Sequence, residues 1–168
     1  MYHPKGVSLI ELLVTIGIIA VLAALAAPSF SAFLDSTRLA SATNLLIADL
    51  NRARSEAIKR NRRVLVCVSN ATGTDCATTT AWAAGWLVCA DADNNGACDA
   101  STSADPNPLS VRPAISGTLV ISTTTAAASV RFNPDGSFTG NQPFTLQKGV
   151  TGTPKQINIS SVGNISKQ

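Results

Sequence analysis

Four cysteines are the residues whose type and spacing point most directly to chemistry. Cys67 and Cys76, and then Cys89 and Cys98, form two pairs with the same separation of nine positions. Four cysteines allow three disulfide connectivities, of which we favour the local one, Cys67 with Cys76 and Cys89 with Cys98. The alternative is a zinc site, which would need all four thiolates at unusual spacing, because neither pair has the C-x-x-C form and His3 is the only histidine.

An acidic turn lies between the second pair of cysteines. Asp91, Asp93 and Asn95 alternate and a glycine follows, which matches the first half of a calcium loop. No glutamate stands at the twelfth position of such a loop. A turn closed by the second disulfide explains the same residues, since Asp, Asn and Gly tolerate left-handed backbone. We therefore expect no cofactor, and keep calcium at these three residues as the alternative.

Basic residues are concentrated between positions 38 and 63. This segment has seven Lys and Arg against two acids, whereas positions 64 to 168 have five basic and six acidic residues. Such clusters contact phosphates in nucleic acids, but they also form solvated helix faces with cations near the carboxyl end. We favour the solvated face. The candidate DNA-binding residues are Arg52, Arg54, Lys59, Arg60, Arg62, Arg63 and Lys167.

The sequence argues against an enzyme. The only histidine is at position 3, there is no glycine-rich phosphate loop, and the cysteines are expected to be oxidised. Neither a Ser/His nor a Cys/His arrangement is therefore available for nucleophilic catalysis. We assign no catalytic residues.

One carboxylate interrupts an apolar segment near the start of the chain. Only 14% of the 168 residues are charged, against about 25% in a soluble domain, and between Val7 and Ala27 Glu11 is the only ionisable side chain. A helix over residues 7–27 would be about 32 Å long, enough to span a bilayer of ~30 Å. Lys5 precedes it, so the remainder of the chain is expected to be extracytoplasmic. Insertion of a carboxylate into a bilayer within such a helix costs about 3 kcal/mol, so its presence here indicates a function.

Three interpretations fit this amino-terminal segment. Ala24, Leu25 and Ala26 form an A-x-A pattern, which is typical of a cleaved signal peptide. A plain membrane anchor is the second interpretation. The third is a short leader that is cut off before the helix, so that the helix stays in the mature chain. In a filament of parallel helices, the amine that this cut creates in one subunit could neutralise Glu11 of its neighbour.

The helical pattern continues beyond Pro28. We expect Pro28 to kink the helix rather than end it, because the apolar pattern resumes afterwards. A helix from Val7 to Arg60 would be roughly 80 Å long. Apolar residues recur at steps of three and four, as one stripe of an amphipathic helix: Leu39, Ala42, Leu46, Leu50, Ala53 and Ala57.

The rest of the chain is typical of short strands and turns. Asp135 and Gly136 predict a hairpin, and the segments 71–84 and 99–113 predict surface loops. We expect an antiparallel sheet that is covered on one face by the helix stripe, which makes the fold α+β. The predicted strands are Val64–Ser69, Gly85–Ala90, Thr118–Ser122, Ser129–Asn133, Phe144–Gln147 and Gln156–Ser160.

The first residues resemble the leader of type IV pilins and type II secretion pseudopilins. The run from Lys5 to Val14, KGVSLIELLV, has a short basic leader that ends in glycine before an apolar helix. The resemblance implies that a prepilin peptidase cuts after Gly6 and methylates Val7. Glu11 is then the fifth mature residue, where the family keeps a glutamate, and Pro28 is the twenty-second, where the family has its proline. The family usually has phenylalanine where this chain has Val7.

A second block resembles the GspH/FimT branch of minor pilins and pseudopilins. The resemblance implies a type IV pilin-like fold, with a long helix on an antiparallel sheet domain. Some FimT relatives are DNA receptors with arginines after a glycine in the last strand turn, where this chain has one lysine, Lys167, after Gly163. The resemblance rests on ARSEAIKRN at 53–61 leading into VLVC at 64–67, Trp82, GWLV at 85–88, DADNNG at 91–96, Phe132 and Gly136.

The resemblance implies a non-enzymatic subunit that helps to initiate or cap a filament. The alternatives are a DNA-binding minor pilin and a membrane-anchored periplasmic domain. The expected partners are other pilins, a prepilin peptidase and the bacterial inner membrane, from which the subunit enters the pilus or pseudopilus. The predicted parts are a cleaved leader at 1–6, a transmembrane and filament-core helix at 7–27, its amphipathic continuation at 28–63, and a β-rich extracytoplasmic domain at 64–168.

Overall fold

The structure is a computed structural model with one long helix and nine strands in its described part. It describes residues 6–102, 105–115, 117–124, 126–140, 144–149 and 152–168, apart from the side chains at 25–29. The chain divides into two units, Met1–Arg38 and Leu39–Gln168. One helix, α1 (Leu9–Arg60), begins in the first unit and ends in the second.

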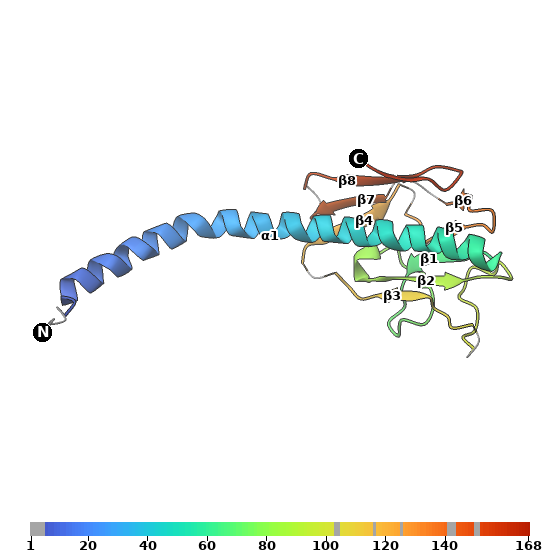
Figure 1. The fold of residues 1–168 in the computed structure, drawn as a ribbon, viewed down its shortest axis with the longest axis horizontal. Helices are drawn as coiled ribbons and strands as arrows, with labels where there is room; N and C mark the ends of the chain where they lie inside the picture. The colour runs from blue at the N-terminus through green and yellow to red at the C-terminus, as the bar shows by residue number, and fades with distance from the viewer. Residues whose placement is uncertain (1–5, 103–104, 116, 125, 141–143, 150–151) are drawn as a thin grey trace, which may run out of the picture. The chain divides into compact units, whose positions relative to one another are not determined.

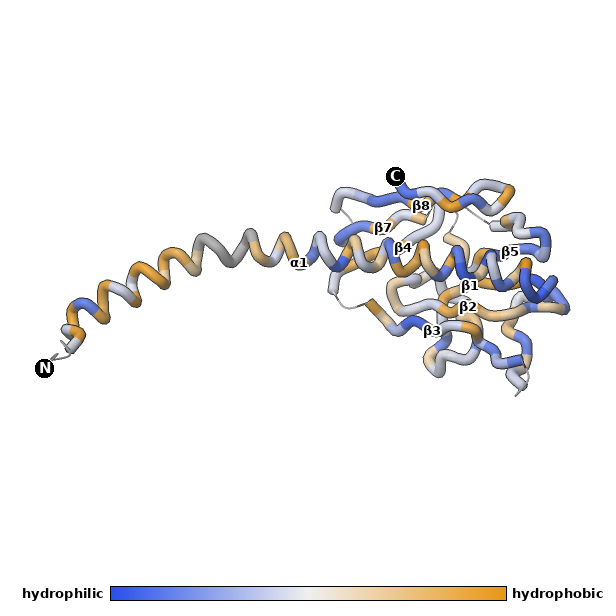
Figure 2. Tube along the Cα trace, viewed as in Figure 1, coloured by the Kyte–Doolittle hydropathy of each residue, from blue (hydrophilic) through white to orange (hydrophobic). Residues whose placement is uncertain are grey.

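In the first unit, α1 begins two residues later than predicted. Gly6, Val7 and Ser8 are exposed and lie outside the helix. Glu11 is in the first turn of the helix, where a carboxylate interacts favourably with the positive end of the helix dipole. The helix continues through Pro28 as predicted, and the proline side chain lies outside the described residues. Hydrophobic residues follow one another along this part of α1 (Figure 2). Within the described residues, no helix combines the length and hydropathy needed to cross a membrane.

In the second unit, the predicted apolar stripe of α1 is confirmed. All six stripe residues are buried, and Leu39, the most exposed of them, is 8% exposed. The helix ends at Arg60 because Asn61 takes a left-handed conformation with φ of 50°. The amides of Asn61 and Arg62 then donate to the carbonyls of Ile58 and Ala57, a Schellman cap.

The predicted antiparallel sheet structure is confirmed, and its strands divide into two sheets (Figure 1). Alternation of side chains predicts which residues face the core, but not which strands pair. The first sheet has the order β3-β2-β1-β5-β6, from Ser110–Arg112, Trp86–Ala90, Val64–Val68, Ser129–Phe132 and Phe138–Thr139. The second has the order β4-β7-β8-β9, from Leu119–Thr123, Phe144–Lys148, Lys155–Ile159 and Ile165–Lys167.

The six predicted strands all exist, with ends that differ by a residue, and three short strands were missed. β3 lies inside the segment 99–113, which was predicted as a loop, and β6 and β9 are two and three residues long. The predicted hairpin at Asp135 and Gly136 is confirmed, because β5 pairs with β6 in the register Phe132 to Phe138. The amide of Phe138 also donates to the carbonyl of Ser161 at 2.9 Å, which links the two sheets.

The two faces of the first sheet have different cores. Val64, Val66 and Val68 of β1 face the main core, which also contains the α1 stripe and apolar residues of the second sheet. Leu65 and Cys67 face the other way and join Leu87 and Cys89 of β2 in a separate small core. Loops cover this outer face, which explains why β1 and β2 are buried along their whole length.

Candidate functional site

The amino-terminal candidate site lies on the exposed first unit. Large apolar side chains of α1 from Leu9 to Leu22 are each more than half exposed, and Phe30 and Phe33 are exposed to a similar extent. Glu11 is the one carboxylate among these residues and is itself exposed. Gly6 and Val7, the predicted processing residues, precede the helix. Their processing and the role of Glu11 stay predictions, because they concern partners and enzymes outside the chain.

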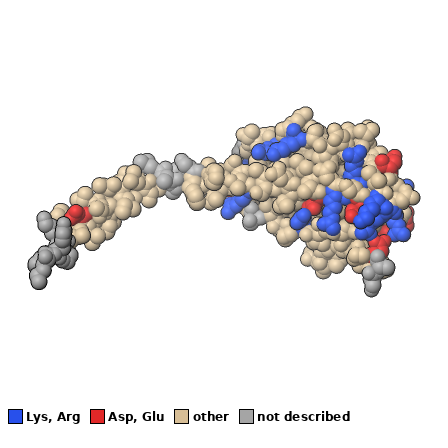
Figure 3. Space-filling view, in the orientation of Figure 1, with Lys and Arg blue, Asp and Glu red and all other residues tan. Residues whose placement is uncertain are grey.

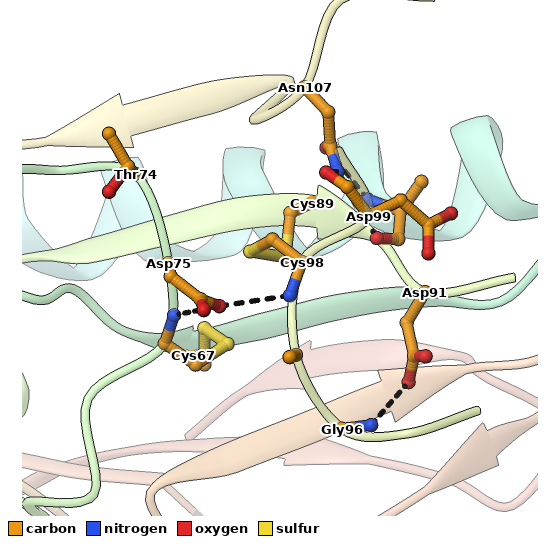
Figure 4. Close-up of a disulfide and its surroundings, with 12 residues drawn as sticks. Cys67, Thr74, Asp75, Cys89, Asp91, Gly96, Cys98, Asp99 and Asn107 are labelled. Carbon is orange, nitrogen blue, oxygen red and sulfur yellow. Dashed lines mark hydrogen bonds between the residues drawn. A yellow bond between two sulfur atoms is a disulfide. The ribbon is translucent and has the colours of Figure 1, made fainter. Parts of the chain in front are cut away.

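The cysteines form the two predicted disulfides. Cys67 pairs with Cys76 and Cys89 with Cys98, with Cα atoms 5.6 Å and 5.5 Å apart. Cys67 and Cys89 are fully buried on neighbouring strands, and their partners lie on loops above them. Asp75 joins the two loops, because its Oδ1 accepts hydrogen bonds from the amides of Cys76 at 2.7 Å and Cys98 at 2.9 Å (Figure 4).

The acidic turn has its own hydrogen bonds. Asp91 is fully buried, and its carboxylate accepts from the amide of Asn95 at 2.9 Å. It also accepts from the amide of Gly96 at 3.2 Å (Figure 4). Asp93 accepts from the amide and the side chain of Asn95. Carboxylate oxygens of Asp91, Asp93 and Asp99 lie within 4.8 Å of one another. These hydrogen bonds account for the sequence of the turn, and a calcium ion there stays a prediction.

Three of the candidate DNA-binding arginines have partners within the chain. Arg54 donates from Nε to the carbonyl of Gly136 at 3.2 Å and from Nη2 to that of Val162 at 3.0 Å. Arg62 bonds Asp105 at 3.1 Å. Arg60 bonds both Asp105 and Glu56, the latter at 2.6 Å. The hydrogen bond from Arg60 lowers the pKa of the Glu56 carboxyl.

The remaining candidate cations take no part in salt bridges among the described residues. In the described part of the chain, no salt bridge within 4.0 Å involves Arg52, Lys59, Arg63 or Lys167. Lysine and arginine side chains gather near the carboxyl end of α1, with acidic side chains between them (Figure 3). Lys167 lies on β9 and is exposed. On the face shown, the surface near the carboxyl end of α1 therefore carries charges of both signs.

An ion pair with a buried carboxylate, which was not predicted from the sequence, ties α1 to the first sheet. The carboxylate of Asp49 is 2% exposed and accepts two bonds from Arg112, at 2.8 Å and 3.0 Å. Nε1 of Trp86 donates to the same carboxylate at 2.9 Å. The sequence contains a signal for the burial of Asp49. This residue follows Leu46 by three positions and precedes Ala53 by four, which places it on the apolar stripe of α1.

A hollow of about 650 Å³ lies beside β3. Residues 69–73 form one side and residues 111–114 the other, and Arg112 is its charged lining residue. The described residues that line it include no carboxylate, cysteine or histidine.

Two family models match the chain. The model described as type II transport protein GspH matches residues 42–163, from the α1 stripe to the last turn. The chain belongs to the GspH family. The prokaryotic N-terminal methylation motif matches residues 1–27. This GspH-family chain is therefore a minor pilin or pseudopilin, a structural and non-enzymatic subunit of a class that associates with other pilins in a filament.

Solved structures support the same fold for the GspH-family chain. It is similar to the type IV minor pilin FimU of Pseudomonas aeruginosa in one crystal form, with 24% identity, a TM-score of 0.62, and coverage of 81% of this chain and 92% of FimU. A second crystal form of FimU gives 23% identity, a TM-score of 0.54, and coverage of 76% and 90%. No curated protein matches the chain. The predicted pilin-like fold is confirmed.

Proposed function

We propose that this chain is a minor subunit that helps to initiate or cap a type IV pilus or a type II secretion pseudopilus. Before assembly, residues 7–27 hold it in the bacterial inner membrane, with the β-rich domain in the periplasm. A prepilin peptidase cuts after Gly6 and methylates Val7. The family match and the methylation motif support this proposal.

The exposed apolar side chains of the first unit carry the proposal. Leu9, Ile10 and Ile19 are each at least 64% exposed, and neighbouring apolar residues are similarly uncovered. An apolar surface of this size is unfavourable in water, so it requires lipid or other apolar helices. A subunit that moves from a bilayer into a filament of parallel helices satisfies both requirements.

The carboxylate of Glu11 has a different energetic cost in lipid and in a filament. In lipid its carboxylate is costly, whereas in a filament the free amine of a neighbouring subunit, created by cleavage after Gly6, can pair with it. The ion pair would stabilise the assembled state relative to the membrane state. It would also set the axial register between neighbouring helices.

The experiment replaces Glu11 in the full-length chain, expressed in a host that lacks the native copy. The substitution Glu11→Gln keeps the size of the side chain and removes its charge. Thr15→Val, one turn further along α1, is the matched control, because it also removes a polar group from the apolar segment. Sheared filaments and membranes are then compared by immunoblot, together with piliation and secretion.

We expect the Glu11→Gln chain to accumulate in the membrane and to be several-fold depleted in filaments, while Thr15→Val behaves like the wild type. Equal incorporation of both variants would reject the role of Glu11. A complete deletion that changes neither piliation nor secretion would reject the assembly role itself. A deletion that changes one of them identifies the system to which the subunit belongs.

DNA binding during uptake is the second candidate function. Arg52, Lys59 and Arg63 make no salt bridge within the described residues, so they remain available to phosphates. The test measures affinity for duplex DNA over a salt series, with the variant Lys59→Gln/Arg63→Gln. Loss of two phosphate contacts would reduce the salt slope by about two. An unchanged slope would exclude these residues as the DNA contact.

A further inference from the structure

The sulfur atoms of all four cysteines lie in one cluster. Cys67 and Cys89 come from neighbouring strands and point to the same side of the sheet, with Cys98 on a loop beside Cys89 (Figure 4). Cys76 comes from a second loop and is bonded to Cys67. The four Sγ atoms lie within 4.8 Å of one another. Two disulfides that were only structural clamps would not need to be adjacent.

The cluster has nearly the dimensions of a tetrathiolate metal site. With a Zn–S distance of about 2.3 Å, four sulfurs at the corners of a tetrahedron are about 3.8 Å apart. Sulfurs that are not bonded to each other are already within 4.8 Å. Opening a disulfide lets a bonded pair separate from about 2.0 Å. Side-chain shifts on the order of 1–2 Å would therefore convert one arrangement into the other.

Hydrogen bonds hold the two loops in place independently of the disulfides. The Asp75 carboxylate bonds the amides of Cys76 and Cys98 and so joins the loops to each other. The amide of Ala77 donates to the Val68 carbonyl at 2.7 Å, and that of Asp99 to the Ala90 carbonyl at 2.9 Å. These bonds fix each loop to its strand beside the cysteine, so reduction leaves the four sulfurs as neighbours.

We propose that the four cysteines, once reduced, form a binding site for a soft divalent cation, Zn²⁺. Each disulfide accepts two electrons and two protons from a reductant of the dithiol or phosphine class and yields two thiols. Binding of Zn²⁺ then releases the four thiol protons and forms four Zn–S bonds. Thiolates select zinc over calcium or magnesium, which prefer oxygen ligands. The same loops are thus cross-linked to the sheet in either redox state.

The surroundings of the cluster set its affinity. Leu65 and Leu87 form an apolar floor beside the buried Cys67 and Cys89, which shields the sheet side of the site from water, whereas Cys76 and Cys98 are partly buried. A tetrathiolate with Zn²⁺ carries a net charge of −2, and the Asp75 carboxylate lies directly beside two of its ligands. Asp75 therefore weakens the site by like-charge repulsion, whereas an asparagine would keep the oxygen acceptor without the charge.

The test uses the full-length chain in detergent, reduced with a phosphine and titrated with Co²⁺ as a spectroscopic probe. We expect one Co²⁺ per chain, with the visible absorption and sulfur-to-cobalt charge-transfer bands of a tetrahedral tetrathiolate, and displacement by one Zn²⁺. The reduced Cys76→Ser/Cys98→Ser variant should bind at least about 100-fold more weakly, because two ligands are lost. The variant Asp75→Asn should bind several-fold more tightly.

Three outcomes would overturn the proposal. The first is that the reduced wild type takes up no more metal than the Cys76→Ser/Cys98→Ser variant. The second is a cobalt spectrum typical of octahedral coordination. The third is the appearance of metal-bridged dimers in gel filtration. If reduction alone unfolds the chain, Zn²⁺ must restore the fluorescence of the buried Trp82 and Trp86. Failure of Zn²⁺ to do so also rejects the site.

Discussion

At the scale of single residues, the buried carboxylate of Asp49 is the feature with the largest expected effect on stability. It is nearly inaccessible, and Arg112 and Trp86 supply its three hydrogen bonds. Burial of an ionised carboxylate is costly unless its charge and lone pairs are satisfied. Asp49 therefore links α1 to β3 through Arg112 and to β2 through Trp86, and it needs both partners.

The first prediction concerns Arg112. Arg112→Met should lower the free energy of unfolding by about 3 kcal/mol, because the charge of Asp49 is left buried without its partner. Urea unfolding of the full-length chain in detergent measures this. The double variant Asp49→Asn/Arg112→Met should recover more than half of the loss, since the amide oxygen still accepts from Trp86. A double variant as unstable as the single one would contradict the electrostatic explanation.

The second prediction concerns the pH dependence contributed by Glu56. The hydrogen bond from Arg60 lowers the pKa of this carboxyl below its ordinary value of 4.5. Its contribution to stability is therefore complete above pH 4.5 and is lost as the pH falls through the lower folded-state pKa. The stability difference between wild type and Glu56→Gln should shrink over this acid range. A difference that stays constant down to pH 3 or so would contradict the assignment.

At the scale of elements, the two sheets meet at the carboxyl-terminal part of α1. Arg54 donates to the carbonyls of Gly136, in the β5–β6 turn, and of Val162, in the β8–β9 turn. Gly163 has a φ of 79°, and a Cβ there would overlap the Gly136 carbonyl oxygen and lie 2.9 Å from Arg54 Nε. Only glycine fits at this junction, both for its backbone conformation and for the space available.

The third prediction compares two glycines of similar backbone conformation. Gly163→Ala should cost at least about 3 kcal/mol, because left-handed strain is combined with overlap. Gly96 has a φ of 83°, but nothing lies within 4 Å of an added Cβ. Gly96→Ala should therefore cost only about 1 kcal/mol. If both variants lost the same free energy of unfolding in urea, the contact between the two turns would not constrain the residue at position 163.

The fourth prediction concerns the turn between β2 and β3. Asp91 and Asp93 already accept backbone hydrogen bonds, and the second disulfide closes the turn. The melting temperature should therefore change by less than about 1 °C between excess chelator and millimolar calcium. A calcium-dependent rise of several degrees would establish the alternative, a calcium site at Asp91, Asp93 and Asn95.

At the scale of the whole molecule, the chain combines two kinds of surface. Apolar side chains are exposed along the first unit, whereas in the second the large apolar residues are mostly collected into two cores. The exposed apolar surface of the first unit is unfavourable in water, whereas the second unit has its own core. This division agrees with a family whose members associate with one another in a filament.

The fifth prediction concerns the mature chain. Mass spectrometry of the protein recovered from membranes of a host with a prepilin peptidase should find Val7 as the first residue, carrying one methyl group. Gly6 and Val7 lie outside the helix and are exposed, as a protease requires of its substrate. Deletion of the peptidase gene should leave the leader attached. A mature chain that begins at Ala27 would instead indicate an ordinary signal peptide.

Local patterns allowed much of the fold to be predicted from the sequence. The helix stripe, six strands and both disulfides follow from periodicity and short spacing, which depend on neighbours along the chain. The leader could likewise be recognised as one continuous motif. The division into two sheets and the strands β3, β6 and β9 could not, because two or three residues carry no period and strand pairing is non-local.

From the sequence one can predict that an apolar helix with one carboxylate precedes a disulfide-stabilised β domain of the pilin kind. The folded chain was needed to find which charged side chains are bonded to distant parts of the chain. Asp49 and Arg112 are separated by 63 positions yet share a buried contact, and Arg54 is committed to two distant turns. It also brought four sulfurs from two local pairs into one cluster. Sequence spacing fixes contacts within an element, whereas packing between elements places these groups side by side.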